Sequence, residues 1–212
     1  MRAAACYLSS RSAVFGIMLA LAPAQIPGPL DASGPIPSFI ASGGSGYRPG
    51  DGTLAEWALA AWQKAAEGAI EFKKSEEESA LLRLYWVSAQ SGRYGEMRPI
   101  LVRGKRGAAI FVQPVVEGLG AEISALARED PLFRDTVVYL TCLHELGHAL
   151  GLQHTADYDD IMFFFGYGGD IPNYFRRYRR KLKTRQDISK VSGLSEADIN
   201  RIHKLYPKTA KH

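Results

Sequence analysis

Cysteine is scarce in this sequence: the 212 residues contain only two, Cys6 and Cys142. Two cysteines cannot build a disulfide-rich scaffold, and they cannot supply a four-cysteine zinc or iron–sulfur site. The formal net charge is only +4, which is too small to indicate nucleic-acid binding by itself, and we expect no nucleic-acid partner. The composition, 46% hydrophobic and 23% charged, is that of a globular protein with one domain of ordinary size.

Long hydrophobic runs are also lacking. The apolar stretch 13–22 is well short of the roughly 20 residues that cross a bilayer, so we expect no transmembrane segment. Arg2 and Arg11 precede this stretch, and Ala22 and Ala24 place small residues where a signal peptidase cleaves. We therefore interpret residues 1–24 as a signal peptide, cleaved near Ala24, of a secreted or periplasmic protein; the alternative is an uncleaved membrane anchor.

Composition also divides the rest of the chain. Residues 25–46 are rich in Pro, Gly and Ser, which predicts a flexible lead-in with little to bury. The folded domain is then expected over residues 47–207, with a short tail at 208–212.

Three helix starts are indicated. Thr53 with Glu56 forms a capping-box pattern, Asp130 precedes Pro131 as an N-cap, and Ser195 opens a last helix. Between the first two helices, strands are indicated at 82–87 and, as a hairpin, at 99–103 and 108–113. Helix, strands and helix in this order predict an α+β fold.

One motif carries chemistry. His144 and His148 are one helical turn apart, so both imidazoles can reach one metal ion. Gly151 allows the left-handed turn that ends the helix, after which His154 can return as a third ligand. Three neutral imidazoles leave a fourth position of Zn²⁺ for water, and Glu145 is placed to take a proton from that water and pass it on.

The motif from His144 to His154 is the metzincin signature, and the sequence after it resembles the matrixin family. Met162 stands at the distance of the Met-turn, where a methionine packs beneath the zinc. Asp198 matches an acidic residue that supports the Met-turn in matrixins. The resemblance implies a metzincin catalytic domain with a twisted, mostly parallel sheet, an edge strand, an active-site helix, a Met-turn and a C-terminal helix.

The resemblance also implies a zinc endopeptidase, and we expect a monomer. The protein or peptide substrate would lie extended along the sheet edge, provided by residues 99–103 or 108–112. Phe163 and Phe164 are candidates for the lining of the S1′ pocket, although burial in the core is the alternative. Residues 69–118 contain no His or Asp, so we expect one catalytic Zn²⁺ and no second structural zinc, while calcium stays open.

The segment 173–185 contains seven Lys and Arg and no acid, with Tyr174, Tyr178 and Leu182 at helical spacing. It predicts a basic amphipathic helix, either a solvated face or a surface for an anionic partner. Two other functions stay open. The zinc site could serve a hydrolase that acts on another amide, and the basic segment could be the working surface of a catalytically silent binding module.

Overall fold

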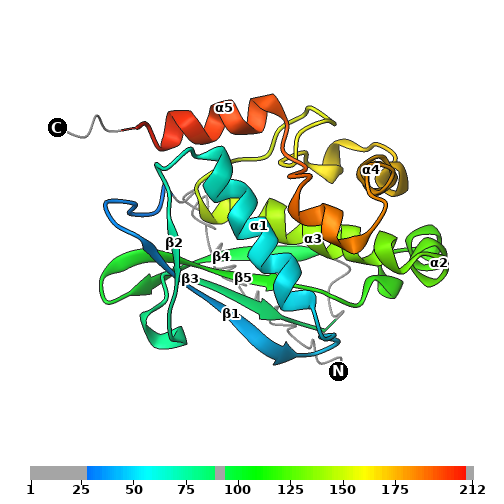
Figure 1. Ribbon diagram of the computed structural model, residues 1–212, viewed down its shortest axis with the longest axis horizontal. Helices are drawn as coiled ribbons and strands as arrows, with labels where there is room; N and C mark the ends of the chain where they lie inside the picture. Colours follow the sequence, from blue (N-terminus) through cyan, green and yellow to red (C-terminus); the bar gives the residue numbers. More distant parts are fainter. Residues whose placement is uncertain (1–27, 89–93, 209–212) are drawn as a thin grey trace, which may run out of the picture.

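The computed structural model describes residues 28–88 and 94–208, and the proposed signal peptide and the end of the tail lie outside the described residues (Figure 1). One five-stranded sheet forms a layer of the molecule. Its strands in spatial order are β2 (Phe72–Lys74), β1 (Ile36–Gly44), β3 (Leu82–Trp86), β5 (Lys105–Val112) and β4 (Gly95–Val102). Four strands are parallel, and β4 is an antiparallel edge strand. The sheet is therefore mostly parallel, as predicted, and the expected hairpin is β4–β5.

Helices cover one face of this sheet. They are α1 (Asp51–Ala65), α2 (Ala121–Glu129), α3 (Pro131–Ala149), α4 (Ile171–Arg179) and α5 (Glu196–Leu205). The helices α1 and α3 lie side by side (Figure 1), and the fully buried Trp62 of α1 donates a hydrogen bond from Nε1 to the Leu143 carbonyl at 2.9 Å. No helix among the described residues is long and apolar enough to cross a membrane.

Two of the three predicted helix starts are confirmed. Asp130 caps α3, since its carboxylate accepts from the Leu132 amide at 3.0 Å, with Pro131 at the first position. Ser195 caps α5 and forms a reciprocal capping box with Asp198. Local sequence sets both boundaries, because each cap satisfies amides that would otherwise be unpaired.

The predicted start of the first helix is wrong. The helix α1 begins at Asp51, after Gly50 with a φ of 98°, and Thr53 lies inside it without a capping role. Asp51 is buried, accepts from the Arg48 amide at 2.8 Å and forms an ion pair with Arg134 of α3. A tertiary contact therefore fixes this helix end.

The predicted flexible lead-in at 25–46 is also wrong over most of its length. Strand β1 lies inside the sheet, where Ile36 pairs with Phe72 of β2 and Ser38 pairs with Leu82 of β3. Ile36 is fully buried. The domain therefore begins well before residue 47, because both neighbouring strands need β1 as a hydrogen-bonding partner.

The segment before β1 is held against the C-terminal end of α3. The Tyr206 hydroxyl accepts from the Leu30 amide at 2.8 Å and donates to the Leu150 carbonyl at 2.9 Å. Gly151 ends the helix with a φ of 103°, as its predicted role requires. A side chain there would also come within 3.2 Å of the Gly28 backbone. Glycine at 151 thus serves the turn and the contact with the N-terminal segment.

Candidate metal centre and active site

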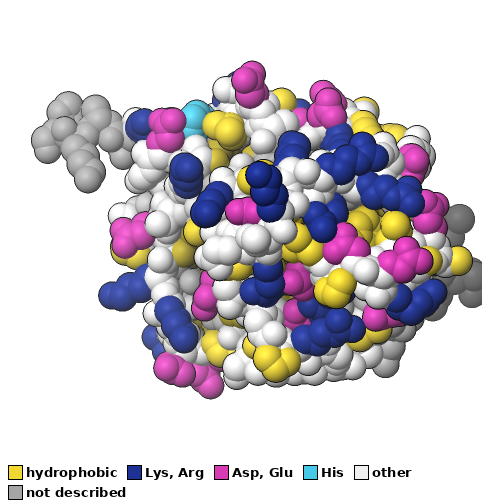
Figure 2. All heavy atoms as spheres, turned by 45° about the vertical axis from the view of Figure 1, so that its right-hand side comes forward, with side chains coloured by type: hydrophobic (Ala, Val, Ile, Leu, Met, Phe, Trp, Pro, Cys, Tyr) yellow, Lys and Arg dark blue, Asp and Glu magenta, His cyan; other side chains and the backbone are white. Residues whose placement is uncertain are grey.

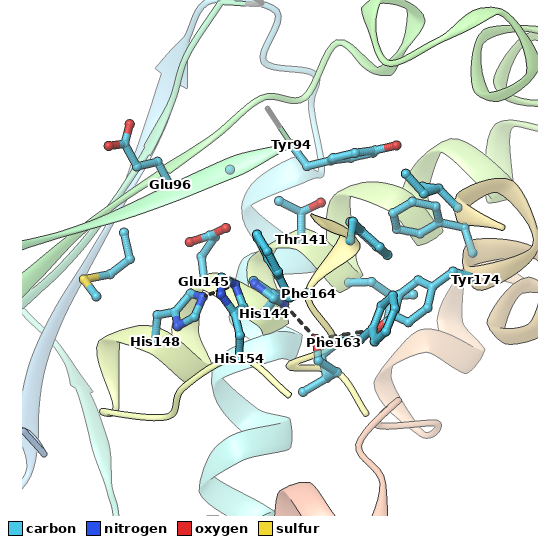
Figure 3. Close-up of a pocket in the computed structure, with 17 residues that line it drawn as sticks. Tyr94, Glu96, Thr141, His144, Glu145, His148, His154, Phe163, Phe164 and Tyr174 are labelled. Atoms are coloured by element: carbon cyan, nitrogen blue, oxygen red, sulfur yellow. Dashed lines mark hydrogen bonds between the residues drawn. The ribbon is translucent and has the colours of Figure 1, made fainter. Parts of the chain in front are cut away.

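Three histidines converge at one end of α3 (Figure 3). His144 and His148 project from successive turns of the helix, and His154 returns after the turn at Gly151. One ligand atom from each ring lies within 4.8 Å of the other two. The Nε2 atoms of His148 and His154 are only 3.0 Å apart. The three imidazoles therefore converge closely enough to share one metal ion, as the spacing of the histidines in the motif predicts.

The backbone fixes the orientation of two of these rings. His144 Nδ1 lies 2.7 Å from the Ile161 carbonyl, and His148 Nδ1 lies 3.0 Å from the Leu152 carbonyl. In the neutral tautomer that donates from Nδ1, the Nε2 lone pair is free for a metal.

Burial favours the neutral imidazoles that a metal needs. It lowers the pKa of His144 to about 3 and that of His154 to about 4, in both cases with the charge of His148 as a further cause. Burial also lowers the pKa of His148 itself. Three neutral imidazoles, two of them oriented by backbone carbonyls, fit Zn²⁺ with a position left over for water or substrate.

Glu145 lies beside this cluster with 7% of its surface exposed. Burial, with a smaller contribution from Glu96, raises its pKa to about 8, and a hydrogen bond from the Met97 backbone opposes the shift. Gly95 of β4 makes this arrangement possible, because a Cβ there would lie 2.7 Å from Glu145 Cγ and 2.9 Å from Thr141 Cγ2. A glycine is therefore required where the edge strand passes the carboxylate.

Met162 is fully buried and lies against α3 at Gly147, between the two helical histidines, as expected for the methionine of a Met-turn. The Met162 carbonyl accepts from the Thr155 amide at 2.9 Å, which joins the Met-turn to the residue after His154. Gly147, between the two helical ligands, allows Met162 to approach, because a Cβ there would lie 2.4 Å from the Met162 sulfur. The motif thus contains a second glycine with a packing role.

Two buried acids support the loop before Met162. Asp198 of α5 is fully buried and accepts from the Ile161 amide at 2.8 Å, the contact expected near the Met-turn. Burial raises the pKa of Asp198. Burial acts in the same direction on Asp160, but hydrogen bonds from Ser195, Arg201 and Thr155 outweigh it and leave the pKa of Asp160 lowered. These contacts tie α5 to the metal centre.

A cavity of about 660 Å³ opens beside the histidines and continues into an apolar pocket (Figure 3). Phe163 is 5% exposed and forms part of its wall, whereas Phe164 is 41% exposed and stacks on the His154 ring with 4.6 Å between centroids. Both residues therefore line the cavity, Phe164 beside the metal ligands. Further apolar lining comes from Leu140, Ile161, Ile171, Tyr174 and Phe175.

Several residues of this site have no local signal in the sequence. Tyr94 and Gly95 reach the cavity only because β4 is the edge strand above α3. Tyr174 and Phe175 reach it only because α4 packs beside α3. Both placements are properties of the tertiary structure.

The basic segment forms the predicted helix only in part, since α4 ends at Arg179. Tyr174, Tyr178 and Leu182 are buried, as their spacing predicted. Figure 2 brings the α2 and α4 side forward, and Lys and Arg side chains there are interspersed with Asp and Glu. Four of the seven cations form ion pairs with acids of other segments: Arg176–Glu122, Arg177–Asp159, Arg179–Asp130 and Arg185–Asp135.

This chain is similar to a known family and to two solved structures. The family model described as matrixin matches residues 51–207. Among solved structures, myroilysin is similar at 15% identity with a TM-score of 0.42, and covers 83% of this chain and 94% of its own. High choriolytic enzyme 1, a hatching enzyme zinc-protease from Oryzias latipes (medaka fish), is similar at 21% identity with a TM-score of 0.41 and coverages of 82% and 90%. A search of curated proteins finds no match.

The family match spans most of the chain and includes the three histidines, Glu145, the Met-turn and the supporting acid of α5. With the sheet topology and the metal centre described above, it shows that the chain belongs to the matrixin family of metzincin zinc peptidases.

Proposed function

We propose that this protein is a secreted endopeptidase that hydrolyses peptide bonds with one catalytic Zn²⁺ held by His144, His148 and His154. The proposal rests on a single arrangement: three neutral imidazoles and the Glu145 carboxylate at the mouth of an apolar pocket, directly below the edge strand β4. When bound, zinc would polarise the scissile carbonyl and lower the pKa of water.

The outer edge of β4, which pairs with no other strand among the described residues, supports an extended peptide as the substrate. The Tyr94 carbonyl accepts from Gln113, the residue that follows β5, at 3.0 Å. Because backbone direction alternates along an antiparallel pair, Gly95 and Met97 point their N–H and C=O groups away from β5. Gly95 can therefore pair with a peptide by strand addition, whereas the Met97 amide donates to Glu145 and would pair with a peptide only when it releases that carboxylate. Pro99 is the next outward-facing residue and has no N–H, so it interrupts the row of outward-facing donors directly after Met97.

Glu145 is the group placed to move protons. Its carboxylate lies under Gly95, so it is close to a peptide bond paired with the edge strand. We assign it to take a proton from the attacking water and to pass that proton to the leaving amine nitrogen. Its raised pKa suits this second step, because a carboxyl group that retains a proton near neutral pH is an effective acid.

The pocket supports a preference for a bulky apolar side chain after the scissile bond. Its walls are aromatic and aliphatic, and they include the stacked rings of Phe163 and Tyr174 and the Leu140 side chain of α3. Burying a large apolar side chain there is favourable by about 1.5–3 kcal/mol.

The alternatives receive less support. The outward-facing backbone of β4 favours a peptide over another amide, which could not use it. Ion pairs engage four of the seven cations in the basic segment, which leaves less unpaired charge for an anionic partner.

Metal analysis combined with casein or gelatin cleavage tests the proposal, using wild type, Glu145→Gln and the matched variant Glu56→Gln on the exposed face of α1. We expect about one zinc per chain in all three proteins and activity in wild type and Glu56→Gln only. Activity that survives in Glu145→Gln would refute the assignment of the base. Zinc binding without cleavage of any unfolded protein or peptide would favour a hydrolase of another amide.

Secretion is tested separately. The proposed cleavage site near Ala24 lies four residues before the first described residue, Gly28. We expect the exported protein to begin at Gln25, as read by intact mass or N-terminal sequencing. Retention of residues 1–24 would instead support the membrane anchor.

A further inference from the structure

The peptide unit between Asp160 and Ile161 is held at both of its polar ends. On one side, the Ile161 amide donates to Asp198 of α5 at 2.8 Å. On the other side, the Asp160 carbonyl accepts from the Tyr174 hydroxyl of α4 at 2.9 Å. Two helices from different parts of the chain thus clamp one peptide unit, and the sequence pattern indicated only Asp198.

The clamped unit is directly connected to a metal ligand. The next carbonyl, that of Ile161, is the partner of His144 Nδ1 at 2.7 Å, and the Tyr174 hydroxyl lies 3.5 Å from the same oxygen. A rotation of this backbone would therefore move the hydrogen bond that orients the His144 ring. Because orienting hydrogen bonds of this kind tune the affinity of a site for its metal, the position of Tyr174 has a chemical consequence.

Arg177 fixes the Tyr174 ring. Its guanidinium lies 4.6 Å from the ring centroids of both Tyr158 and Tyr174, so it packs in the corner formed by these two rings, which meet at an angle of 76°. It also donates hydrogen bonds to the Asp159 carboxylate and the Tyr158 carbonyl, in the loop that leads to the Met-turn. Arg177 therefore joins α4 to this loop by cation–π contacts and by charge-assisted hydrogen bonds.

We propose that Tyr174 and Arg177 are positioning residues of the metal centre, which act on His144 through the Asp160–Ile161 backbone. This gives part of the basic segment a function inside the protein. The inference rests on the proposed zinc-dependent function, and it concerns metal affinity and the geometry of the ligands.

The test measures the Zn²⁺ dissociation constant by competition with a chromophoric chelator. Tyr174→Phe removes the hydroxyl and keeps the ring in the pocket wall. The matched control is Tyr178→Phe, one turn further along α4, which removes a similar buried hydrogen bond, from the Tyr178 hydroxyl to the Val191 carbonyl at 2.5 Å. Thermal denaturation verifies that both variants are folded.

We expect Tyr174→Phe to weaken Zn²⁺ binding about five- to tenfold, at or just below the usual range for residues that orient ligands indirectly, and Tyr178→Phe to change it less than about twofold. Arg177→Met should also weaken Zn²⁺ binding, and Arg177→Lys should weaken it less than Arg177→Met does. The control Arg176→Met removes the ion pair with Glu122 and should leave Zn²⁺ binding unchanged.

In the affinity measurements, two results would overturn the inference: unchanged affinity in a folded Tyr174→Phe protein, or equal losses in Tyr174→Phe and Tyr178→Phe. Absence of Zn²⁺ binding in wild type would instead refute the proposed function, so the two failures are distinguishable. Co²⁺ in place of Zn²⁺ adds a second readout, because its visible absorption band reports the ligand geometry. A band in Tyr174→Phe identical to that of wild type would also contradict the inference.

Discussion

Gly147 offers a sharp test of how the Met-turn packs against the active-site helix. Substitution by alanine adds one Cβ, which would lie 2.4 Å from the Met162 sulfur and 3.2 Å from Trp62 Cζ2. Both neighbours are fully buried, and the Trp62 indole is also held by its hydrogen bond to Leu143. The added atom therefore has to displace Met162 or the helix itself.

Two opposing effects set the magnitude. Alanine is preferred to glycine in a helix by about 1 kcal/mol. Overpacking of a well-packed interior costs about 1–3 kcal/mol, and the short distance to sulfur places this site towards the upper end. The expected net effect of Gly147→Ala is a loss of about 1–2 kcal/mol in the free energy of unfolding, or about 2–8 °C in Tm for a domain of this size.

Gly52 in α1 provides the matched control. A Cβ at Gly52 would meet only the Tyr47 hydroxyl at 3.4 Å, so Gly52→Ala should gain up to about 1 kcal/mol. Urea denaturation of both variants gives the comparison. Gly147→Ala as stable as Gly52→Ala would refute the packing argument.

A double-mutant cycle identifies the neighbour responsible. Met162→Ala alone leaves a cavity and should cost about 2–5 kcal/mol. In that background the Cβ of Gly147→Ala has room, so the double variant should be less destabilised than the sum of the single variants, by more than about 0.5 kcal/mol. Strict additivity would show that Met162 is not the obstacle.

Three further predictions follow from the fold and the site. A chain that begins at Gly28 should fold, whereas one that begins at Tyr47 should not, because the shorter chain lacks β1. Circular dichroism and resistance to trypsin distinguish the folded from the unfolded chain. A folded chain that begins at Tyr47 would contradict the sheet topology. In the metal-free protein, Glu145→Gln should increase the unfolding free energy at pH 8 by on the order of 1–4 kcal/mol and much less at pH 5. The Glu145 pKa of about 8 in the folded state exceeds the ordinary value of 4.5, so between these pH values the folded state binds more protons than the unfolded state, and wild-type stability falls as pH rises. An equal increase in unfolding free energy at pH 5 and pH 8 in urea titrations would oppose this reasoning. Arg134→Met leaves the buried Asp51 carboxylate without its cation and should cost about 3–5 kcal/mol in the same titrations, and a cost below about 1 kcal/mol would show that the ion pair contributes little.

The parts of the structure that the sequence predicted are those with a short-range physical cause. His144 and His148 share a helix face at any place in any fold, because the helix period sets their spacing. Asp130 and Ser195 cap helices through amides two or three residues away. Such contacts need no knowledge of the tertiary structure.

The parts that were missed or wrong depend on contacts between distant segments. Strand β1 has a composition typical of a linker, and it becomes a strand because β2 and β3 lie on either side of it. Asp51 begins α1 because Arg134, more than eighty residues later, forms an ion pair with it. Tyr174 belongs to the metal centre through a carbonyl on another loop, so no motif could mark it.

The proline in the edge strand has a consequence for the protein in concentrated solution. An exposed strand edge attracts other strand edges, including that of a second copy, and continued pairing of this kind leads to aggregation. In β4 the outward-facing residues Gly95 and Met97 lie in the cleft, the Met97 amide donates to Glu145, and Pro99 interrupts the row immediately beyond them. The same short edge that accepts a peptide is therefore a poor template for extended pairing between copies, and Pro99→Ala should make the protein more prone to form β-rich aggregates.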